Sequence, residues 1–326
     1  MKIVFMGTPE FAVPSLRLIA ENPDFEIVGV VTQPDRPKGR GKKLKAPPIK
    51  ELALELGLPI IQPVSVNSQE ALDVISQWKP DVIVVVAFGQ ILKPQLLSLP
   101  PKGCINLHAS LLPKYRGPAP IHWAIINGEN VTGVTTQFMS EKLDAGDIIL
   151  QEEVEIGPEE TAGELHDRLA DVGAVLLVKT LKLLAQGKAE PKKQDESKVS
   201  YAPLLTSKDE VVNWNKEAFK IVNHIRGMNP WPGVYTKLNG RILKIWRAKV
   251  YDEELVSDVP GKVLDFVEEG FVVQAGQGQV LVVEVQPEGK PKMTAADFII
   301  GRNIEKGHIL GKEWIESSTI GGNNES

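Results

Sequence analysis

Short runs of β-branched, apolar residues alternate with helical segments through the first half of the chain, and this alternation limits the fold more than any other feature. Runs that are apolar on both faces are typical of parallel strands, which need helical crossovers between them. The expected strands are 2–6, 26–32, 82–86 and 103–107, the expected helices are 14–21, 49–56, 69–78 and 161–186, and the more evenly alternating stretches 132–139 and 147–156 predict an antiparallel hairpin. We therefore expect an α/β fold, with a Rossmann-like, mostly parallel sheet that binds ligands at the carboxyl ends of its strands.

The composition and the hydropathy pattern of the sequence change after residue 187. Residues 188–200, KAEPKKQDESKVS, are charged and almost without apolar side chains, which is typical of a linker. A helical segment at 216–226 precedes short β patterns at 234–238, 241–250, 261–267, 270–275 and 279–285. Short strands with Gly and Pro turns predict a small OB-like β-barrel. The expected organisation is an α/β domain at 1–187, a linker at 188–206, a C-terminal β-barrel domain at 207–320 and a disordered tail at 321–326.

Three polar side chains stand where such a sheet would bind a ligand. Asn106 and His108 are two residues apart at the end of a predicted strand, so both side chains leave it on the same face. Asp144 lies in the turn LDAGD. Taken singly, these are typical of a hydrogen-bonded Asn, a core or surface His, and a backbone cap. The turn Gly7–Phe11 lacks the glycine fingerprint of a dinucleotide site, which favours an ordinary strand-to-helix turn there.

Taken together, these residues resemble the folate-dependent formyltransferase family. The mark of that family is an Asn-x-His strand end followed by Ser-Leu-Leu-Pro and a later Asp, which here are Asn106, His108, 110–113 and Asp144. The resemblance also covers MGTPEFAVPSL, TQPDRPKGRGKKL, VVVAFGQIL, CINLHASLLPKYRGPAPI, TGVTTQFM and, past the linker, NPWPG. It spans nearly the whole chain, and the motifs are specific in combination. The resemblance implies an enzyme that transfers a formyl group from 10-formyltetrahydrofolate to an amine, with its catalytic domain at 1–187.

The resemblance further implies that Asn106, His108 and Asp144 are the catalytic residues. An amine that attacks a formyl carbon places negative charge on the formyl oxygen, and N–H donors held in place near that oxygen are each worth about 3–4 kcal/mol. Asn106 and a protonated His108 would be those donors. Asp144 would stabilise the charged form of His108, orient it, or pass protons through water. No covalent intermediate is needed, and Cys104 is expected to be a buried strand residue rather than a nucleophile.

The folate is implied to bind at two loops. The first follows the strand at 82–86 and would offer backbone groups to the pterin, with Ile91 and Leu92 as apolar walls. The second is the Ser-Leu-Leu-Pro element. The expected folate-binding residues are Phe88, Gly89, Gln90, Ile91 and Leu92 in the first loop and Ser110, Leu111, Leu112 and Pro113 in the second. On local sequence alone, the first loop is an ordinary βα connection.

Basic residues cluster in two windows although the formal net charge of the chain is −5. Residues 36–50 contain seven Lys or Arg and residues 237–249 contain five, with no acid in either window. A charge run is usually a solvated face, but 34–50 is also too long for a simple βα connection. In the resembling family this loop enters a tRNA acceptor stem, which implies initiator methionyl-tRNA as the acceptor and 207–320 as a tRNA-binding domain. The expected contacts are Arg36, Lys38, Arg40 (the main one), Lys42, Lys43 and Lys45, with Lys237, Arg241 and Lys244 in the second domain.

Other functions fit the sequence less well. A related formyltransferase could act on a small amine such as glycinamide ribonucleotide or an amino sugar, but the basic loop and second domain would then need another purpose. A catalytically silent RNA-binding protein would not need Asn106, His108 and Asp144. A nicotinamide-dependent dehydrogenase would be expected to carry the missing glycine fingerprint.

Cysteine, histidine and hydropathy patterns limit the remaining classes. Cys104 is the only cysteine and the five His are scattered, so we expect neither a disulfide nor a bound metal. No segment approaches the ~20 apolar residues that a membrane span needs. These observations predict a cytoplasmic protein, which we expect to be a monomer.

Overall fold

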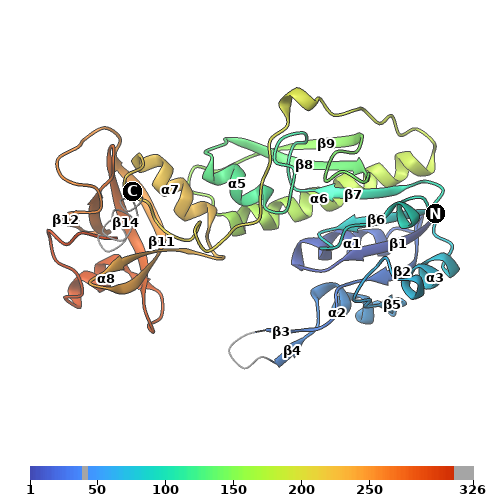
Figure 1. Cartoon of the computed structure of the whole chain (residues 1–326), viewed down its shortest axis with the longest axis horizontal. Coiled ribbons are helices and arrows are strands. Elements are labelled where there is room, and N and C mark those ends of the chain that lie inside the picture. The colour runs from blue at the N-terminus through green and yellow to red at the C-terminus, as the bar shows by residue number, and fades with distance from the viewer. Residues whose placement is uncertain (39–42, 312–326) are drawn as a thin grey trace, which may run out of the picture. The chain divides into compact units, whose positions relative to one another are not determined.

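The computed structural model describes residues 1–38 and 43–311, which divide into two compact units (Figure 1). Unit 1 comprises Met1–Pro120, Val131–Glu155 and His166–Pro203, and unit 2 comprises Ile121–Asn130, Ile156–Leu165 and the chain from Leu204. The predictions made for Arg40, Lys42 and the tail at 321–326 lie outside the described residues.

A seven-stranded sheet forms the centre of unit 1, in the order β5-β2-β1-β6-β7-β8-β9. Its strands are β1 (Lys2–Gly7), β2 (Glu26–Val31), β5 (Ile60–Ile61), β6 (Val82–Val86), β7 (Cys104–His108), β8 (Val131–Phe138) and β9 (Ile148–Glu155). The pairs from β5 to β7 are parallel, and β8 and β9 add an antiparallel edge. Every residue of β6 is buried, as expected of a central parallel strand. The predicted mostly parallel α/β sheet with a hairpin extension is confirmed.

Helices occupy the crossovers of this sheet. They are α1 (Val13–Ala20) after the 3-10 turn η1 (Glu10–Ala12), α2 (Pro48–Glu55), α3 (Gln69–Gln77) and the short α4 (Pro94–Leu97). The chain also forms α5 (Pro120–Ile126), the long α6 (Ala162–Ala185) and the 3-10 turn η2 (Glu196–Lys198). Helix α3 begins where the Ser68 hydroxyl accepts a hydrogen bond from the Ala71 amide. The predicted helices are confirmed, whereas α4 and α5 were not predicted because each is only one or two turns long.

The basic loop between β2 and α2 contains a hairpin that the sequence did not predict. Strand β3 (Arg36–Lys38) pairs antiparallel with β4 (Lys43–Lys45), and Figure 1 shows this pair projecting from the sheet beside α2. At its base, Asp35 accepts hydrogen bonds from Gln62 at 2.7 Å and Lys50 at 2.7 and 2.8 Å. The Gln62 bond, together with Lys50, lowers the pKa of Asp35 below its ordinary value. The loop is therefore anchored at its base.

Unit 2 contains an antiparallel sheet with the strand path β10-β11-β14-β13-β12, to which β15 adds beside β14. The strands are β10 (Val234–Leu238), β11 (Arg241–Asp252), β12 (Val263–Val267), β13 (Gly270–Gln274), β14 (Gln279–Pro287) and β15 (Met293–Thr294), and the helices are α7 (Ala218–Gly227) and α8 (Ala295–Ile300). Side chains from α7, α8 and the sheet, among them Ile221, Phe298 and Phe271, share one apolar core. The predicted C-terminal domain of short strands, expected to be OB-like, is confirmed as an antiparallel sheet domain, while β15 and α8 were not predicted.

Candidate active site

The end of β7 carries the first two polar residues of the site. In the ladder with β8, Asn106 lies opposite Gln137 and His108 opposite Thr135, so the four side chains share one face of the sheet. Asn106 is half-buried and His108 is buried. The strand period therefore places both where the sequence predicted.

Asp144 reaches the same place from the loop between β8 and β9. Its backbone has a φ of 48°, a conformation that is uncommon for a residue with a side chain. The loop returns close to the end of β8, and a Cβ atom on Gly146 would lie 1.6 Å from the Phe138 carbonyl oxygen. Only glycine fits at that position, which explains the Gly of LDAGD. The side chain of Asp144 is 12% exposed.

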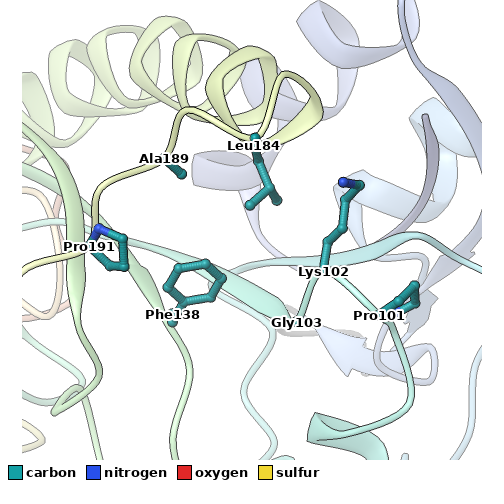
Figure 2. Close-up of a pocket in the computed structure, with 8 residues that line it drawn as sticks. Pro101, Lys102, Gly103, Phe138, Leu184, Ala189 and Pro191 are labelled. Atoms are coloured by element: carbon teal, nitrogen blue, oxygen red, sulfur yellow. The ribbon is translucent and has the colours of Figure 1, made fainter.

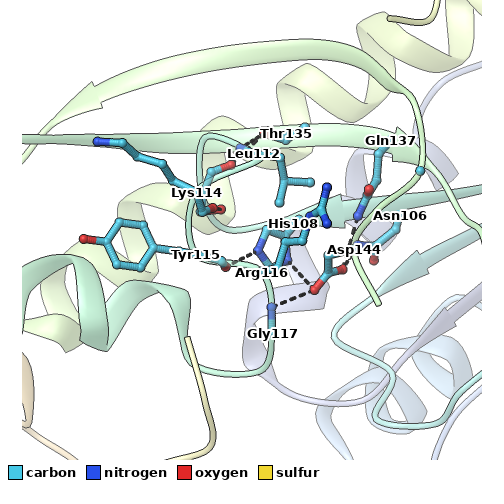
Figure 3. A network of polar contacts seen from close by, with 12 residues as sticks. Asn106, His108, Leu112, Lys114, Tyr115, Arg116, Gly117, Thr135, Gln137 and Asp144 are labelled. Carbon is cyan, nitrogen blue, oxygen red and sulfur yellow. Dashed lines mark hydrogen bonds and ion pairs between the residues drawn. The ribbon is translucent and has the colours of Figure 1, made fainter. Parts of the chain in front are cut away.

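The carboxylate of Asp144 accepts hydrogen bonds from residues in three parts of the chain (Figure 3). Its Oδ1 accepts hydrogen bonds from Gln137 Nε2 at 3.2 Å and, at the limit of a hydrogen bond, from Asn106 Nδ2 at 3.5 Å. Its Oδ2 accepts the Gly117 backbone N–H at 2.9 Å and lies 3.7 Å from His108 Nδ1. The structure thus brings the three predicted catalytic residues into one cluster.

The His108 ring is held in one orientation by a backbone carbonyl. Nε2 lies 2.9 Å from the Tyr115 carbonyl oxygen, which can only accept, so Nε2 carries a hydrogen and donates it. When the ring is neutral, Nδ1 therefore has the free lone pair. That atom faces the Asp144 carboxylate, whose Oδ2 is 3.7 Å away.

The Ser-Leu-Leu-Pro loop is fixed by side-chain hydrogen bonds. Ser110 Oγ donates to the Lys114 carbonyl at 2.6 Å, and Thr135 Oγ1 donates to the Ser110 carbonyl at 2.6 Å. Thr135 Oγ1 in turn accepts the Leu112 amide at 3.1 Å, and Gln151 Nε2 donates to the Leu112 carbonyl at 2.9 Å. Ser110 and Leu112 are buried, whereas Leu111 and Pro113 are partly exposed. This predicted folate element is therefore a rigid support beside His108.

The other predicted folate loop, 88–92, follows β6. Phe88 and Leu92 lie in the hydrophobic core, each 2% exposed, and anchor the loop, whereas Ile91 is 77% exposed and Gly89 is also exposed. Gly89 has a φ of 84°, and Gln90 accepts the Val66 amide through Oε1 at 2.7 Å. Leu92 therefore packs into the core instead of forming an apolar wall.

Two residues that were not among the predicted site residues fix the same loop. Thr8 Oγ1 and Gln33 Nε2 both donate to the Phe88 carbonyl, at 3.0 and 3.3 Å. Thr8 lies in the opening GTPEF segment, which carries part of the family resemblance but was predicted to be an ordinary strand-to-helix turn. Its hydroxyl next to a β-strand end was the one signal for this contact.

Of the predicted tRNA contacts in unit 1, the four within the described residues lie on strands β3 and β4: Arg36, Lys38, Lys43 and Lys45. Arg36 and Lys45 are exposed, and Arg36 Nη2 donates to Gln33 Oε1 at 3.2 Å. For Lys38 and Lys43, the structure describes the strand backbone alone.

In unit 2, the predicted contacts line the β10–β11 pair. Lys237 lies opposite Ile242 in the ladder, and Ile242 is two residues before Lys244 on β11. The side chains of Lys237 and Lys244 therefore share one face of the sheet, whereas Arg241, the first residue of β11, is on the other face. Lys244 Nζ donates to the Pro232 carbonyl at 3.3 Å and lies 5.4 Å from the Trp246 ring. Trp246 is 6% exposed and is therefore packed within unit 2. Trp231 is 44% exposed.

The cavity drawn in Figure 2 lies away from these residues, on unit 1. It has a volume of about 480 Å³ and is lined by residues that include Gly103, Phe138, Leu184 and Pro191. Gly103 precedes β7, so the cavity lies at the opposite end of that strand from His108. Its lining contains none of the predicted site residues.

Two further properties concern the described part of the chain. Within residues 1–38 and 43–311, no three His, Cys, Asp or Glu side chains are grouped so that they could hold a metal ion. Among the helices of those same residues, none is long and apolar enough to cross a membrane.

Known proteins share both units of this chain. Residues 1–181 match a family described as formyl transferase, and residues 204–303 match the formyl transferase C-terminal domain. The chain is 54% identical over 312 residues to a methionyl-tRNA formyltransferase from Moorella thermoacetica, covering 95% of this chain and 99% of the relative. It is 50% identical over 311 residues to one from Clostridioides difficile, covering 95% of this chain and 100% of the relative.

Solved structures share the fold at lower identity. An N-formyltransferase from Helicobacter canadensis, in complex with folinic acid and dTDP-3-aminofucose, superposes with a TM-score of 0.65 at 22% identity, covering 87% of this chain and 99% of the other. HypX from Aquifex aeolicus, in complex with tetrahydrofolic acid, gives a TM-score of 0.60 at 19% identity, covering 92% of this chain and 47% of the other. These likenesses concern the fold alone.

Proposed function

Because this chain belongs to the formyltransferase family, and within it to the methionyl-tRNA formyltransferases, we propose that Asn106, His108 and Asp144 catalyse formylation of methionine on initiator tRNA. The enzyme transfers a formyl group to the methionyl amino group and yields N-formylmethionyl-tRNA for translation initiation. The donor is 10-formyltetrahydrofolate. The observation that carries the catalytic assignment is the cluster in which the Asp144 carboxylate lies 3.7 Å from His108 Nδ1 and 3.5 Å from Asn106 Nδ2.

The proposed reaction begins when the neutral methionyl amine attacks the formyl carbon. A bond forms between the amino nitrogen and that carbon, and negative charge collects on the formyl oxygen. Asn106 donates a carboxamide N–H to this oxygen, which is compatible with the structure because its 3.5 Å contact to Asp144 is weak. A donor held in place in this way stabilises the tetrahedral intermediate more than the ground state.

Protons must then move from the attacking nitrogen to the leaving one. The sequence-based hypothesis made a protonated His108 a second donor to the formyl oxygen, but its Nε2–H is already donated to Tyr115. We therefore assign His108 as the base, which accepts a proton from the attacking amine at Nδ1. The Asp144 carboxylate stabilises the resulting imidazolium. His108 returns the proton to N10 of the folate, the bond between N10 and the formyl carbon breaks, and tetrahydrofolate leaves. The proton count closes without a covalent enzyme intermediate.

Substrate binding is assigned to the surrounding elements. We assign the folate to the loops at 88–92 and 110–113, where exposed Ile91 and Gly89 can contact the pterin while Phe88 and Leu92 hold the loop in the core. The tRNA contacts are assigned to the basic loop, including Arg40 and Lys42, and to Lys237, Arg241 and Lys244. Lysines and arginines at these positions attract phosphates whatever the sequence of the nucleic acid.

The deciding experiment measures transfer of labelled formyl from 10-formyltetrahydrofolate to methionyl initiator tRNA. Wild type is compared with N106A and H108A. Rapid transfer by the wild type, with both variants slowed, is the expected result. Transfer to a small amine such as glycinamide ribonucleotide, or release of formate, with no transfer to tRNA, would contradict the proposed acceptor and leave only the folate chemistry.

A further inference from the structure

Gln194 is buried in a stretch of chain whose neighbours are exposed. It is 9% exposed, whereas residues 191–193 and 195–198 face solvent. The segment follows α6 and leads toward unit 2, and its composition predicted a linker. A buried carboxamide needs hydrogen-bond partners, so Gln194 must be held by specific groups.

The acceptor side of Gln194 faces a buried arginine. Its Oε1 accepts hydrogen bonds from Arg116 Nε at 3.0 Å and Nη2 at 2.8 Å. Because a guanidinium only donates, this contact fixes which end of the carboxamide is oxygen. Arg116 is 3% exposed and also pairs with Glu196 at 2.8 Å. The hydrogen bond from Arg116 lowers the pKa of the Glu196 carboxyl below its ordinary value.

The donor side of Gln194 faces the loop that carries Asp144. Its Nε2 lies 2.7 Å from the Asp144 carbonyl oxygen, 2.8 Å from the Gly146 carbonyl oxygen and 3.2 Å from Gln137 Oε1. These three acceptors share the two N–H groups of one carboxamide. Gln194 thus holds the loop backbone on both sides of Ala145.

Gln137 passes this orientation on to the Asp144 carboxylate. Because Gln137 Oε1 accepts from Gln194, its Nε2 points at Asp144 Oδ1, 3.2 Å away. Figure 3 shows Gln137 and Asp144 meeting beside Asn106 and His108. Gln194 therefore holds Asp144 in two ways. It binds the backbone carbonyl of Asp144 directly, and it orients the Asp144 carboxylate through Gln137. The φ of Asp144, 48°, is uncommon for a residue with a side chain, and the bonds from Gln194 to the Asp144 and Gly146 carbonyls hold the loop in this conformation.

We propose that Gln194 is a positioning residue for Asp144, so that the segment between α6 and unit 2 is part of the framework of the active site. This inference rests on the proposed function, in which Asp144 is catalytic. Gln194 is expected to touch no substrate. Its effect comes from holding Asp144 at His108, and a displacement of about 1 Å in such a group can lower the rate about 100-fold.

Two substitutions separate the donor from the acceptor of Gln194. Gln194→Glu keeps an oxygen for Arg116 but sets its second oxygen against the carbonyls of Asp144 and Gly146. Gln194→Met keeps the length of the side chain and removes both contacts. Each is expected to lower kcat by about 10- to 100-fold, with the KM values for methionyl-tRNA and for the folate within about twofold of wild type.

A second measurement reports on Asp144 without any substrate. The Gly117 amide donates to Asp144 Oδ2 at 2.9 Å, so its hydrogen exchange reports whether the carboxylate is in place. Exchange at Gly117 is expected to be faster in Q194E and Q194M, measured well below their unfolding midpoints. Q194E is the deciding variant, because it keeps an oxygen for Arg116, the residue before Gly117. Gln186 is exposed near the end of α6, and Q186E is the matched control, expected to leave both kcat and Gly117 exchange unchanged.

The two measurements also separate this inference from the proposed function. If kcat stays within twofold of wild type in both Gln194 variants, or falls while Gly117 exchange is unchanged, the positioning role is wrong. If the wild type transfers no formyl group to methionyl-tRNA, the proposed function fails on its own. Gly117 exchange then still decides the inference, because a faster exchange supports the hold on Asp144 and an unchanged exchange overturns it.

Discussion

His108 donates its Nε2–H to the carbonyl oxygen of Tyr115, 2.9 Å away, so the imidazole meets the site through Nδ1. A backbone carbonyl cannot change its role with pH, which makes this tautomer a property of the fold. The Tyr115 backbone has a φ of 61°, which is uncommon for a residue with a side chain. The loop conformation and the chemistry of His108 are therefore linked.

The first prediction separates the base from the hydrogen bond. H108Q is expected to keep a donor for Tyr115 but to lack a basic atom, and H108A lacks both. Both variants are expected to lower kcat for formyl transfer by about 10²- to 10⁴-fold, the usual contribution of general acid–base catalysis. The measurement is single-turnover formylation of methionyl-tRNA. A near-normal rate in H108Q would show that His108 serves only as a hydrogen-bond donor.

The second prediction concerns the charge of Asp144. Asp144→Asn keeps the size of the side chain, and its Oδ can still accept the Gly117 amide, but it loses the negative charge beside His108. We expect kcat to fall by about 10²-fold or more because the imidazolium formed during proton transfer is no longer stabilised. Steady-state kinetics with saturating folate and tRNA measures this. D144N with near-normal turnover would remove Asp144 from the mechanism.

The sequence predicted those parts of the fold that depend on local pattern. Strand β6 was found because VIVVV is β-branched and buried on both faces, and Asn106 and His108 were found because a strand places alternate residues on one face. The β3–β4 hairpin was missed because its residues are Arg, Lys and Pro, which show no apolar alternation. The small antiparallel unit was found through its turns.

The support of the site was not predicted because it depends on long-range contacts. Gln194 and Gln137 are 57 residues apart in sequence, and Arg116 and Gln194 are 78 apart. Nothing in the charged run at 188–200 distinguishes Gln194 from its exposed neighbours. The Gly in LDAGD was a signal, but the reason for it, the approach of Gly146 to the Phe138 carbonyl, exists only in the folded chain.

The third prediction concerns the basic loop. Changing Arg40, Lys42 and Lys43 to Glu is expected to raise the KM for methionyl-tRNA about tenfold or more at low salt, with the KM for the folate unchanged. The reason is that these basic side chains attract the phosphate backbone of the tRNA, which the folate does not have. The dependence of binding on salt should also become flatter. Lys179, exposed on α6, gives the control K179E, expected to change neither KM. Equal increases in both KM values would contradict the assignment of this loop.

The fourth prediction concerns the one cysteine. Cys104 is 2% exposed, and burial raises the pKa of its thiol to about 12. At pH 8 the folded protein should therefore contain almost no thiolate and react with a disulfide reagent only as it unfolds. The measurement follows thiol release in native buffer and in denaturant. Rapid reaction of the native enzyme would mean that β7 opens locally, and loss of activity with it would require a new look at the role of Cys104.

The fifth prediction concerns the pH dependence of unit 2. His224 on α7 is half-buried and donates Nε2–H to the Asp209 carbonyl at 2.6 Å, and partial desolvation lowers the pKa of His224 below its ordinary value of 6.5. A group whose folded pKa is lowered contributes stability above its unfolded pKa. This stability is lost as the pH falls below 6.5 toward the folded pKa, because the unfolded chain takes up a proton that the folded chain does not.

The loss has a limit of about 1.4 kcal/mol per pH unit for one proton. The full-length wild type and H224Q, whose carboxamide can still donate to Asp209, are compared by thermal unfolding at pH 7.5 and about pH 5.5. We expect the Tm of the wild type to fall more than that of H224Q over this interval, because glutamine does not titrate. Equal shifts in the two proteins would show that other groups cause the acid sensitivity, and that a proton reaches His224 in the folded state without disturbing its contact to Asp209.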